Sequence, residues 1–450
     1  MSSAKRRKVL SHSVGEGFRR GLLRFAAWRA TRLPSLRRIP DRLIVAPTDL
    51  RAADAFVAEE MAQGRFPLAG RLLSVDDQSP FAVELPSKEF AARLHGFGWL
   101  RHIRAARTDS HDIVARRLTE EWLAIHGRKL VGIAWDPDIV AQRILAWLSH
   151  STVLLRNADI GFYRRFLRSL TAHVRYLEKI AHFCPDGEAR LRVRIALAAA
   201  SVAIPNSARQ VRRTAHHLDE ELDRQILAGV DLRQVQDVVQ DHHQELAALD
   251  QGVDLLPLRQ TYVNLGHDLP ARLIPAIDRM YPALRFFRHQ GGELALFNGA
   301  TTTLANELMS VLRYDETAGR PFKALPHVQY QRLAVGETII IMDTGMPISA
   351  EMSKTAHAGC LSFELSSGKN RYIINSGAPR FAGEHYRQLA RATAAHSTLT
   401  LNDTSSSRIS KSSVSGPVFS DGVSEVLVER YEGEEGGLWL RMTVTWTCLD

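Results

Sequence analysis

The stretch KTAHAGCLSFELSSGKNRYIINSGAPRFAGEHYRQLARATAAHSTLTLND, residues 354–403, decides the fold of the C-terminal part of this chain. Apolar and polar residues alternate in CLSFELSS, RYIIN and HSTLTLN, which is the two-residue period of a half-buried strand. Turn signals follow two of these runs, at Ser367-Gly368 and at Asn402-Asp403. The stretch therefore predicts short strands joined by tight turns.

The same pattern extends from about residue 283 to the last residue. Many short strands with short connections are typical of an antiparallel sandwich. Strand-like runs continue to Asp450 without a capping element, so we expect the sandwich, residues 283–450, to be cut short at this end. The further runs are LRFFRH, ELALFN, YQRLAV, ETIIIMD, VSEVLVERY and GLWLRMTVTW.

The residues before this sandwich have a different period. Apolar residues recur every three or four positions, as in amphipathic helices, and the segments are broken by Gly, Pro and Asp. Short connections bring successive helices side by side, so residues 41–282 are predicted to form antiparallel helix pairs. The expected helices lie near 88–107, 111–126, 138–154, 160–183, 187–203, 207–228, 231–250 and 269–280.

Positive charge is concentrated at the start of the chain. The whole sequence carries a formal charge of +9, from 58 Lys and Arg against 49 Asp and Glu. Residues 1–40 alone hold eleven Lys or Arg and one Glu, so the remaining 410 residues sum to −1. A nearly neutral body has no global field to hold a polyanion, so we expect no specific nucleic-acid binding.

Residues 1–40 are predicted to be a basic arm. Within it, Phe18, Leu22, Phe25 and Trp28 recur at helical spacing among arginines. This pattern suits a helix that lies on an anionic membrane surface. A basic, partly disordered leader is the alternative.

Several other classes of protein are excluded or disfavoured. Three cysteines in 450 residues cannot form a disulfide framework, and no run of eighteen apolar residues predicts a spanning helix. No phosphate-binding loop, dinucleotide-binding glycine pattern or HExxH helix is present. No secretory signal is recognisable, so a cytoplasmic location is expected. The basic clusters 190–194 and 209–213 are expected to be solvated helix faces, with a groove for sugar acids as the alternative.

Residues 354–403 resemble the C-terminal domain of the heparinase II/III-like family. The matching features, in order, are a His-Ala-small lead-in, LSFEL, a strand that ends in an Asn/Asp-Ser-Gly turn, and RxTxAHST. The segment LHGFGWLRHIRA, residues 94–105, is similar to helical domains of bacterial relatives. The resemblance implies an α/α toroid followed by an antiparallel β-sandwich over residues 85–450. It also implies a bacterial lyase of acidic polysaccharides, and a periplasmic location as the alternative to the cytoplasm.

The resemblance implies a zinc site at His357, Asn375 and His396. Two imidazoles and a carboxylate make a sensible zinc set, and the family has an acid where this chain has Asn375. A neutral amide is a poorer ligand, because a carboxylate supplies charge as well as an oxygen donor. Structural hydrogen bonding among these three side chains is therefore the alternative.

The resemblance also implies catalytic and substrate-binding residues on the sandwich. In β-elimination a base removes the C5 proton of a uronate whose carboxylate is neutralised, and an acid protonates the departing O4. His396 and Arg391 are the candidates, since a guanidinium can hold a carboxylate bidentately. An ion pair of Arg391 with Glu364 or Glu384 is the alternative. Thr355, a further substrate-binding candidate, stands where the family usually has another His.

The proton-transfer group from the helices is not assigned by spacing. The segment that carries a Tyr in the family reads GVDLRQVQDVVQDHHQELAALDQG here, without a Tyr. Tyr262 and His243 are the candidate catalytic residues, and His242, Tyr176 and Tyr330 are others. For each, a half-buried aromatic or a surface His is the alternative.

Two functions are compatible with these residues. The first is a polysaccharide lyase-like protein that binds an acidic, uronic-acid-containing glycan between toroid and sandwich and cleaves it by β-elimination. The second is a catalytically degenerate glycan-binding or envelope-assembly protein on the same scaffold. The sequence leaves the glycan, the linkage and the oligomeric state open.

Overall fold

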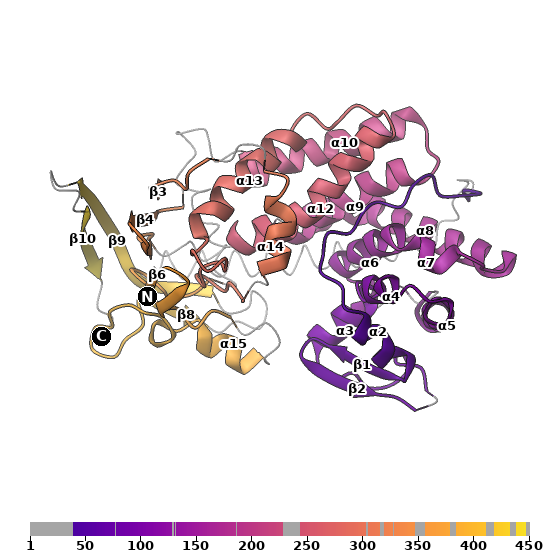
Figure 1. Cartoon of the computed structure of the whole chain (residues 1–450), viewed down its shortest axis with the longest axis horizontal. Helices are drawn as coiled ribbons and strands as arrows, with labels where there is room; N and C mark the ends of the chain where they lie inside the picture. The colour runs from indigo at the N-terminus through magenta and orange to yellow at the C-terminus, as the bar shows by residue number, and fades with distance from the viewer. Residues whose placement is uncertain are drawn as a thin grey trace. The chain divides into compact units, whose positions relative to one another are not determined.

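A computed structural model describes two compact units of this chain (Figure 1). The helical unit contains residues 39–227 and 251–277, and the sandwich unit contains residues 244–250 and 278–446. The division falls inside one helix, between Ile277 and Asp278. The described residues are 39–446 except 77, 128–129, 131, 186, 228–243, 303–304, 316–318, 327, 347–355, 379–383, 411–417 and 433–437.

The helical unit consists of successive helices and one small antiparallel hairpin. The hairpin strands are β1 (Arg65–Leu68) and β2 (Arg71–Ser74). Two helices reach residues assigned to the sandwich unit, α12 (Gln244–Asn264) and α13 (Leu273–Phe287). The other helices are α2 (Ala55–Ala62), α3 (Lys88–His95), α4 (Leu100–Ala106), α5 (Asp109–His126), α6 (Pro137–Ser149), α7 (Ser151–Leu155), α8 (Ile160–Ile180), α9 (Glu188–Ala203) and α10 (Ala208–Leu222).

Side-chain caps explain where most of these helices begin. Ser87, Thr108, Asp136, Asp159 and Ser207 each precede a helix, and each side-chain oxygen accepts a hydrogen bond from a backbone N–H of the first turn. Such a cap satisfies one of the donors that a helix start leaves without a partner, and contributes about 1 kcal/mol. These starts lie within two residues of the predicted ones.

Helix α9 lies at the centre of the helical unit. Almost every side chain from Leu191 to Ala203 is buried, and many of them are alanines that allow close helix packing. Helices α6, α8 and α10 contact α9 (Figure 1). The core of the unit therefore surrounds α9 on all sides, whereas an amphipathic helix would bury only one face.

A buried cation lies in this core. Arg143 on α6 is 0% exposed, and its guanidinium carbon stands 4.1 Å from the centre of the Trp122 ring. Trp135 and Trp147 lie at 5.6 Å and 5.9 Å. Aromatic faces attract a guanidinium electrostatically, and more strongly where water is excluded.

The donors of Arg143 are also paired. Its Nη1 donates to the His95 carbonyl at 2.7 Å, and its Nη2 donates to the Ala134 carbonyl at 2.9 Å. Its Nε donates to Nε2 of His173 at 3.1 Å. Each nitrogen of this buried group thus has an acceptor, which is how a buried polar group avoids a desolvation penalty.

Two predicted helices are interrupted. The segment 88–107 divides into α3 and α4 because Phe97, between two glycines, has a φ of 59°, which ends a right-handed helix. The segment 138–154 divides into α6 and α7 at His150. The predicted helix 231–250 lies outside the described residues up to residue 243.

The sandwich unit has two antiparallel sheets. The five-stranded sheet has the order β3-β4-β5-β6-β7, and the three-stranded sheet has the order β10-β9-β8. Two helices belong to the unit, α14 (Ala305–Leu312) and α15 (Glu384–Ala390). The strands are β3 (Ala324–Leu325), β4 (Tyr330–Val335), β5 (Thr338–Asp343), β6 (Phe363–Ser367), β7 (Asn370–Ile373), β8 (Ser407–Ser410), β9 (Val418–Glu432) and β10 (Leu438–Trp446).

The predicted order, helices followed by an antiparallel sandwich, is confirmed, but three predicted strands are wrong. ELALFN, residues 293–298, forms only an isolated bridge between Leu294 and Arg288. LRFFRH, residues 284–289, is mostly the end of α13, because a short apolar run fits a buried helix as well as a strand. HSTLTLN, residues 396–402, follows a short 3-10 helix, Thr393–Ala395, and forms no strand. The Ser397 carbonyl instead accepts from the Phe363 N–H of β6, and the Ser397 hydroxyl donates to the Ile374 carbonyl just after β7.

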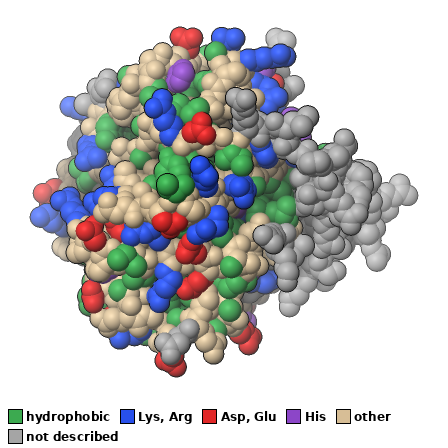
Figure 2. Space-filling view, turned by 90° about the vertical axis from the view of Figure 1, so that its right-hand side faces the viewer, with side chains coloured by type: hydrophobic (Ala, Val, Ile, Leu, Met, Phe, Trp, Pro, Cys, Tyr) green, Lys and Arg blue, Asp and Glu red, His purple; other side chains and the backbone are tan. Residues whose placement is uncertain are grey.

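The surface in Figure 2 carries Lys and Arg interspersed with Asp and Glu. This agrees with a body that is nearly neutral outside the N-terminal arm. Among the described residues, no helix has the length and hydropathy needed to cross a bilayer.

Candidate functional site

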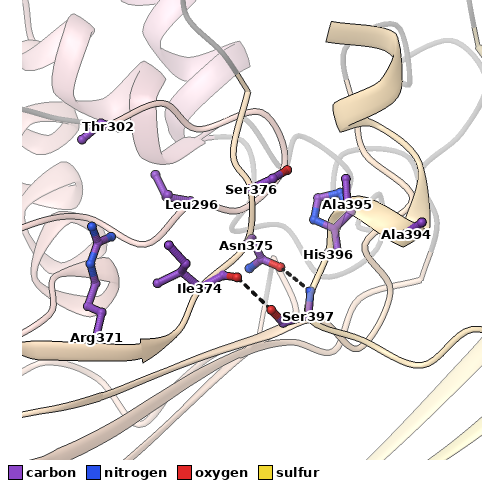
Figure 3. A pocket seen from close by; sticks show the side chains of 10 residues that line it. All are labelled: Leu296, Thr302, Arg371, Ile374, Asn375, Ser376, Ala394, Ala395, His396 and Ser397. Atoms are coloured by element: carbon purple, nitrogen blue, oxygen red, sulfur yellow. Dashed lines mark hydrogen bonds between the residues drawn. The ribbon is translucent and has the colours of Figure 1, made fainter. Parts of the chain in front are cut away.

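A pocket of about 590 Å³ opens on the sandwich unit at the end of β7 (Figure 3). The chain after β7, the chain around the Thr393–Ala395 turn, and the segment before α14 form its walls. The pocket lies entirely within one unit. Its lining residues are Leu296, Thr302, Arg371, Ile374, Asn375, Ser376, Ala394, Ala395, His396 and Ser397.

Two histidines meet beside this pocket. His357, in the segment before β6, and His396 are 7% and 9% exposed. Nδ1 of His357 lies 3.2 Å from Nε2 of His396, so one ring donates to the other. Burial lowers the pKa of His396 to about 4, and the Ala390 carbonyl partly opposes this shift. The His396 ring is therefore neutral at pH 7.

Asn375 lies over a buried acid. Glu364 on β6 is 0% exposed, and its Oε1 accepts from the Asn375 backbone N–H at 3.0 Å and from its side-chain Nδ2 at 3.3 Å. The same oxygen accepts from the Leu296 N–H at 2.8 Å. The amide oxygen of Asn375 accepts from the Ser397 N–H at 3.1 Å. Asn375 thus donates to an acid, which a carboxylate at this position could not do.

The other oxygen of Glu364 is also engaged. Its Oε2 lies 3.1 Å from Nε2 of His289, and Nδ1 of His289 lies 2.8 Å from the Ser366 hydroxyl. Ser366 and the His289 side chain have no exposed surface. The group Ser366, His289 and Glu364 therefore joins β6 to the segment after α13 inside the unit.

Arg371 lines the opposite end of the pocket from His396 (Figure 3). Its Nη1 is buried, and no hydrogen bond or ion pair joins its guanidinium to another residue that the structure describes. A buried donor without a partner costs about 1–3 kcal/mol. The sequence patterns did not single out Arg371, although its place on β7, directly before the Asn375-Ser376-Gly377 turn, was a usable signal.

Comparisons with known proteins bear on the family and the fold of this chain. The family model described as Heparinase II/III-like, C-terminal, matches residues 317–444. The crystal structure of heparinase III matches 95% of this chain and 73% of its own chain, with a TM-score of 0.63 and 14% identity. Residues 317–444 of this chain are therefore similar to the C-terminal domain of heparinase II/III-like proteins. A heparan sulfate lyase from Pedobacter heparinus matches 95% of this chain and 72% of its own, with a TM-score of 0.52 and 16% identity.

At these identities the solved structures show the fold alone. The fold is an α/α toroid followed by an antiparallel β-sandwich, as the sequence predicts. A curated relative is the FtsZ-localized protein C of Caulobacter vibrioides (strain NA1000 / CB15N). It is 28% identical over 406 residues, which cover 89% of this chain and 68% of the relative.

The three residues of the family's zinc position come together here, but they do not fit a zinc ion. His357 and His396 are hydrogen bonded to each other, and the Asn375 oxygen is occupied by Ser397. Within the described part of the chain, no group of three or more His, Cys, Asp or Glu side chains could hold a metal. Because the carboxylate is absent, we derive no chemical step through zinc.

Arg391 is not among the described residues that line the pocket. It is 3% exposed, and its Nε donates to the Ala356 carbonyl at 2.7 Å. Its Nη1 donates to the Gln388 side chain at 3.3 Å. No ion pair joins Arg391 to Glu364, whose oxygens accept from other groups, and the side chain of Glu384, the other partner considered, lies outside the described residues. Arg391 therefore holds α15 against the segment that carries His357.

The candidate proton-transfer residues are not brought to the pocket among the described residues. Tyr262 is 0% exposed in the helical unit, where burial raises the pKa of its phenol to about 12, and the hydroxyls of Ser201 and Thr214 oppose the shift. A fully buried side chain does not contact a dissolved glycan. His243 and Thr355 lie outside the described residues.

Two further tyrosines have structural partners. The Tyr176 hydroxyl donates to the Trp135 carbonyl at 2.8 Å inside the helical unit. The Tyr330 hydroxyl accepts from the Asn298 side chain at 2.8 Å inside the sandwich unit. His242 lies outside the described residues. Tyr176 and Tyr330 are buried, as their alternative interpretation expects.

The expectation that residues 190–194 form a solvated face is wrong. Nε of Arg190 lies 2.9 Å from an oxygen of Glu221, and the Glu221 side chain is 2% exposed. The Arg192 side chain is 11% exposed and pairs with Asp138 at 2.5 Å. These arginines join α9 to its neighbours. Arg209, Arg212 and Arg213 are exposed, in agreement with the expectation for the second cluster.

Proposed function

We propose that this protein binds an acidic glycan in the pocket of the sandwich unit and holds it without cleaving it. The observation that carries the proposal is Arg371, a cation on the pocket wall whose guanidinium has no partner among the described residues. A guanidinium in this state gains most from a bound carboxylate or sulfate, because it can hold two oxygens at once.

The rest of the lining suits a sugar. Leu296 and Ile374 lie beside Arg371 and offer an apolar surface for the C–H face of a pyranose ring (Figure 3). Thr302 is exposed and presents a hydroxyl at the same end. A site with an apolar floor and a few placed polar groups is the usual form of a ligand pocket.

The described residues support binding better than turnover. β-Elimination needs a base and an acid within hydrogen-bond reach of the sugar. His396, with a pKa of about 4, is a weak base, and no tyrosine is among the described residues that line the pocket. The group needed for proton transfer would have to come from elsewhere.

Calorimetric titration of the full chain with a panel of uronic-acid oligosaccharides tests the binding proposal. Arg371→Gln is expected to weaken binding at least about tenfold, the loss of one charge-assisted contact. Lys369→Gln is the matched control, because it removes the same charge from an exposed residue outside the pocket lining. Equal weakening by both variants, or no binding across the panel, would overturn the proposal.

Cleavage by β-elimination is the second candidate function. It is supported by the family fold and by a neutral imidazole, His396, on the pocket wall. The assay is the ultraviolet absorbance of an unsaturated uronate during incubation with the same panel. An increase in absorbance that is absent in His396→Gln would show that the protein is a lyase and would overturn the binding proposal. No increase in absorbance, with binding retained, supports binding without cleavage.

The curated relative adds a partner class to the binding proposal. Since the relative is named for its localisation with FtsZ, we propose that this chain acts in the cell envelope in association with FtsZ. Co-pelleting of the purified chain with FtsZ filaments, compared in GTP and in GDP, is the test, and equal pelleting would contradict it. Membrane contact by residues 1–40 and a cytoplasmic location stay predictions, because residues 1–38 lie outside the described residues.

A further inference from the structure

A second arginine without a partner lies in the helical unit, on α9. Arg194 is 8% exposed, and its Nε has no contact with solvent and no acceptor. No hydrogen bond or ion pair joins its guanidinium to another residue in the described ranges. Its neighbours on the same helix, Arg190 and Arg192, both have carboxylate partners. Among the described residues, Arg194 is thus a buried cation without a hydrogen-bonded or ion-paired anion.

The packing of α9 against α10 places Arg194. The two helices follow each other closely in the chain and run antiparallel. Near one end Arg190 bonds to Glu221, and further along the Thr214 hydroxyl donates to the Ser201 hydroxyl at 2.8 Å. Arg194 is one turn from Arg190 on the same face, so it lies between these two contacts.

His217 lies one turn before Glu221 on α10, and Arg194 lies one turn after Arg190 on α9. Because Arg190 pairs with Glu221 and the helices are antiparallel, His217 faces Arg194. The His217 ring packs edge-on against the ring of His182, with centres 5.8 Å apart. His182 follows α8 and is exposed, and the His217 side chain is 30% exposed. Burial lowers the pKa of His182, and the charge of Arg194 adds to this shift, so the two contacting imidazoles lie near the buried guanidinium.

The nearby carboxylates are already engaged. Glu221 accepts from Arg190 at 2.9 Å, from Arg224 at 3.0 Å and from the Gln225 side chain. Glu220 lies 3.1 Å from Nδ1 of His217 and 3.4 Å from Nε2 of His216. No ion pair joins either acid to Arg194. Burial lowers the pKa of Arg194, and the charges of Glu221 and Glu220 only partly oppose this shift.

We propose that Arg194, His182 and His217 form a binding site for a compact oxyanion of the phosphate or sulfate type. The planar guanidinium presents parallel N–H donors to two oxygens, and the imidazoles can donate to a third from the other side. Donors that approach from several directions suit a tetrahedral anion better than a flat carboxylate. The site uses none of the residues of the sandwich pocket.

The test uses the full chain and inorganic phosphate as the probe, with sulfate and acetate compared at constant ionic strength. Wild-type protein is expected to show a higher Tm in phosphate than in sodium chloride, and a broadened phosphorus NMR signal. Arg194→Gln is expected to lose both effects. Arg212→Gln, which removes an exposed charge from α10, is expected to keep them. A wild-type response in Arg194→Gln, or none in the wild type, would overturn the proposal.

Two variants keep the test valid if Arg194→Gln does not fold. His182→Ala removes an exposed imidazole, and it is expected to weaken phosphate binding about threefold, the loss of one weak donor. Glu220→Gln removes a neighbouring negative charge and is expected to strengthen binding by a similar factor. Unchanged affinity in both would refute the site. Arg371→Gln should retain the phosphate response, which separates this proposal from the glycan proposal.

Discussion

Arg143 in the helical unit and Arg371 in the sandwich unit are the same residue type in opposite situations. Arg143 is completely buried, lies against tryptophan rings, and has an acceptor for each of its nitrogens. Arg371 lines a pocket and has no partner among the described residues. The difference separates an arginine that serves the fold from one that is available to a ligand.

This difference has a thermodynamic basis. A buried donor that is hydrogen bonded contributes modestly to stability, whereas one without an acceptor costs about 1–3 kcal/mol. A bound ligand that supplies an acceptor removes this cost, so a donor without a partner favours ligand binding at its site. Arg143 should therefore matter for unfolding, and Arg371 for binding.

The largest expected effect is on Arg143. Arg143→Met would leave the His95 and Ala134 carbonyls without their donor, and we expect it to lower the free energy of unfolding by about 3–5 kcal/mol. Urea denaturation of both proteins measures the difference. A loss of less than about 1 kcal/mol would show that the tryptophan cage, not the hydrogen bonding, stabilises this core.

The second prediction concerns pH. Burial first, then the charges of His126 and Arg143, lower the pKa of His95 to about 3 from its ordinary 6.5. The unfolded chain therefore takes up the proton first as pH falls. The stabilisation from the neutral ring is complete above pH 6.5 and is lost between 6.5 and about 3.

At pH 5 this loss amounts to about 2 kcal/mol. Neutral His95 accepts from the Trp122 indole, and His95→Gln retains an acceptor but cannot titrate. The variant should therefore lose less stability than the wild type between pH 7 and pH 5 in urea denaturation. His385→Gln, which changes an exposed ring, should keep the wild-type slope. Equal slopes for wild type and His95→Gln would contradict the prediction.

The third prediction concerns Asn375. Asn375→Asp places a second carboxylate against Glu364 and removes a donor, so we expect a loss of about 1–3 kcal/mol. The same change completes a His, Asp, His donor set, so added zinc should restore the stability. Tm with and without zinc, and zinc content after dialysis, are the measurements. Asn402→Asp, at an exposed turn, is the control, and stoichiometric zinc in the wild type would refute the argument.

The smallest effect is expected for Arg371→Met. Because Arg371 has no partner to lose among the described residues, its replacement should change the free energy of unfolding by less than about 0.5 kcal/mol. Urea denaturation beside Arg143→Met gives the direct contrast. A loss above about 2 kcal/mol would mean that the sandwich needs this side chain for folding.

The sequence predicted the architecture because period and capping are local. The helices starting near Ser87, Thr108 and Asp159 carry both signals, and their starts were found within two residues. LRFFRH was mistaken for a strand because six residues are too few to distinguish the two periods. The break at Phe97 depends on a positive φ, which the surrounding glycines allow but do not require.

The site was predicted less completely. The convergence of His357, Asn375 and His396 followed from the family pattern, and the structure brings them together. The pattern did not reveal which side chains have hydrogen-bond partners. The amino-acid sequence alone does not distinguish Arg391, which donates to the Ala356 carbonyl, from Arg371, which has no partner among the described residues. Hydrogen bonding between distant segments depends on the tertiary fold.

The buried group of Ser366, His289 and Glu364 shows that favourable hydrogen-bond geometry alone does not make a functional site. A hydroxyl, an imidazole and a carboxylate stand in the order found in the relay of serine hydrolases, at 2.8 Å and 3.1 Å. Yet the His289 and Glu364 side chains are sealed from solvent, and Ser366 is 0% exposed, so no ester or amide can reach the hydroxyl. A geometric search for hydrolases would select this trio, and accessibility is what rejects it.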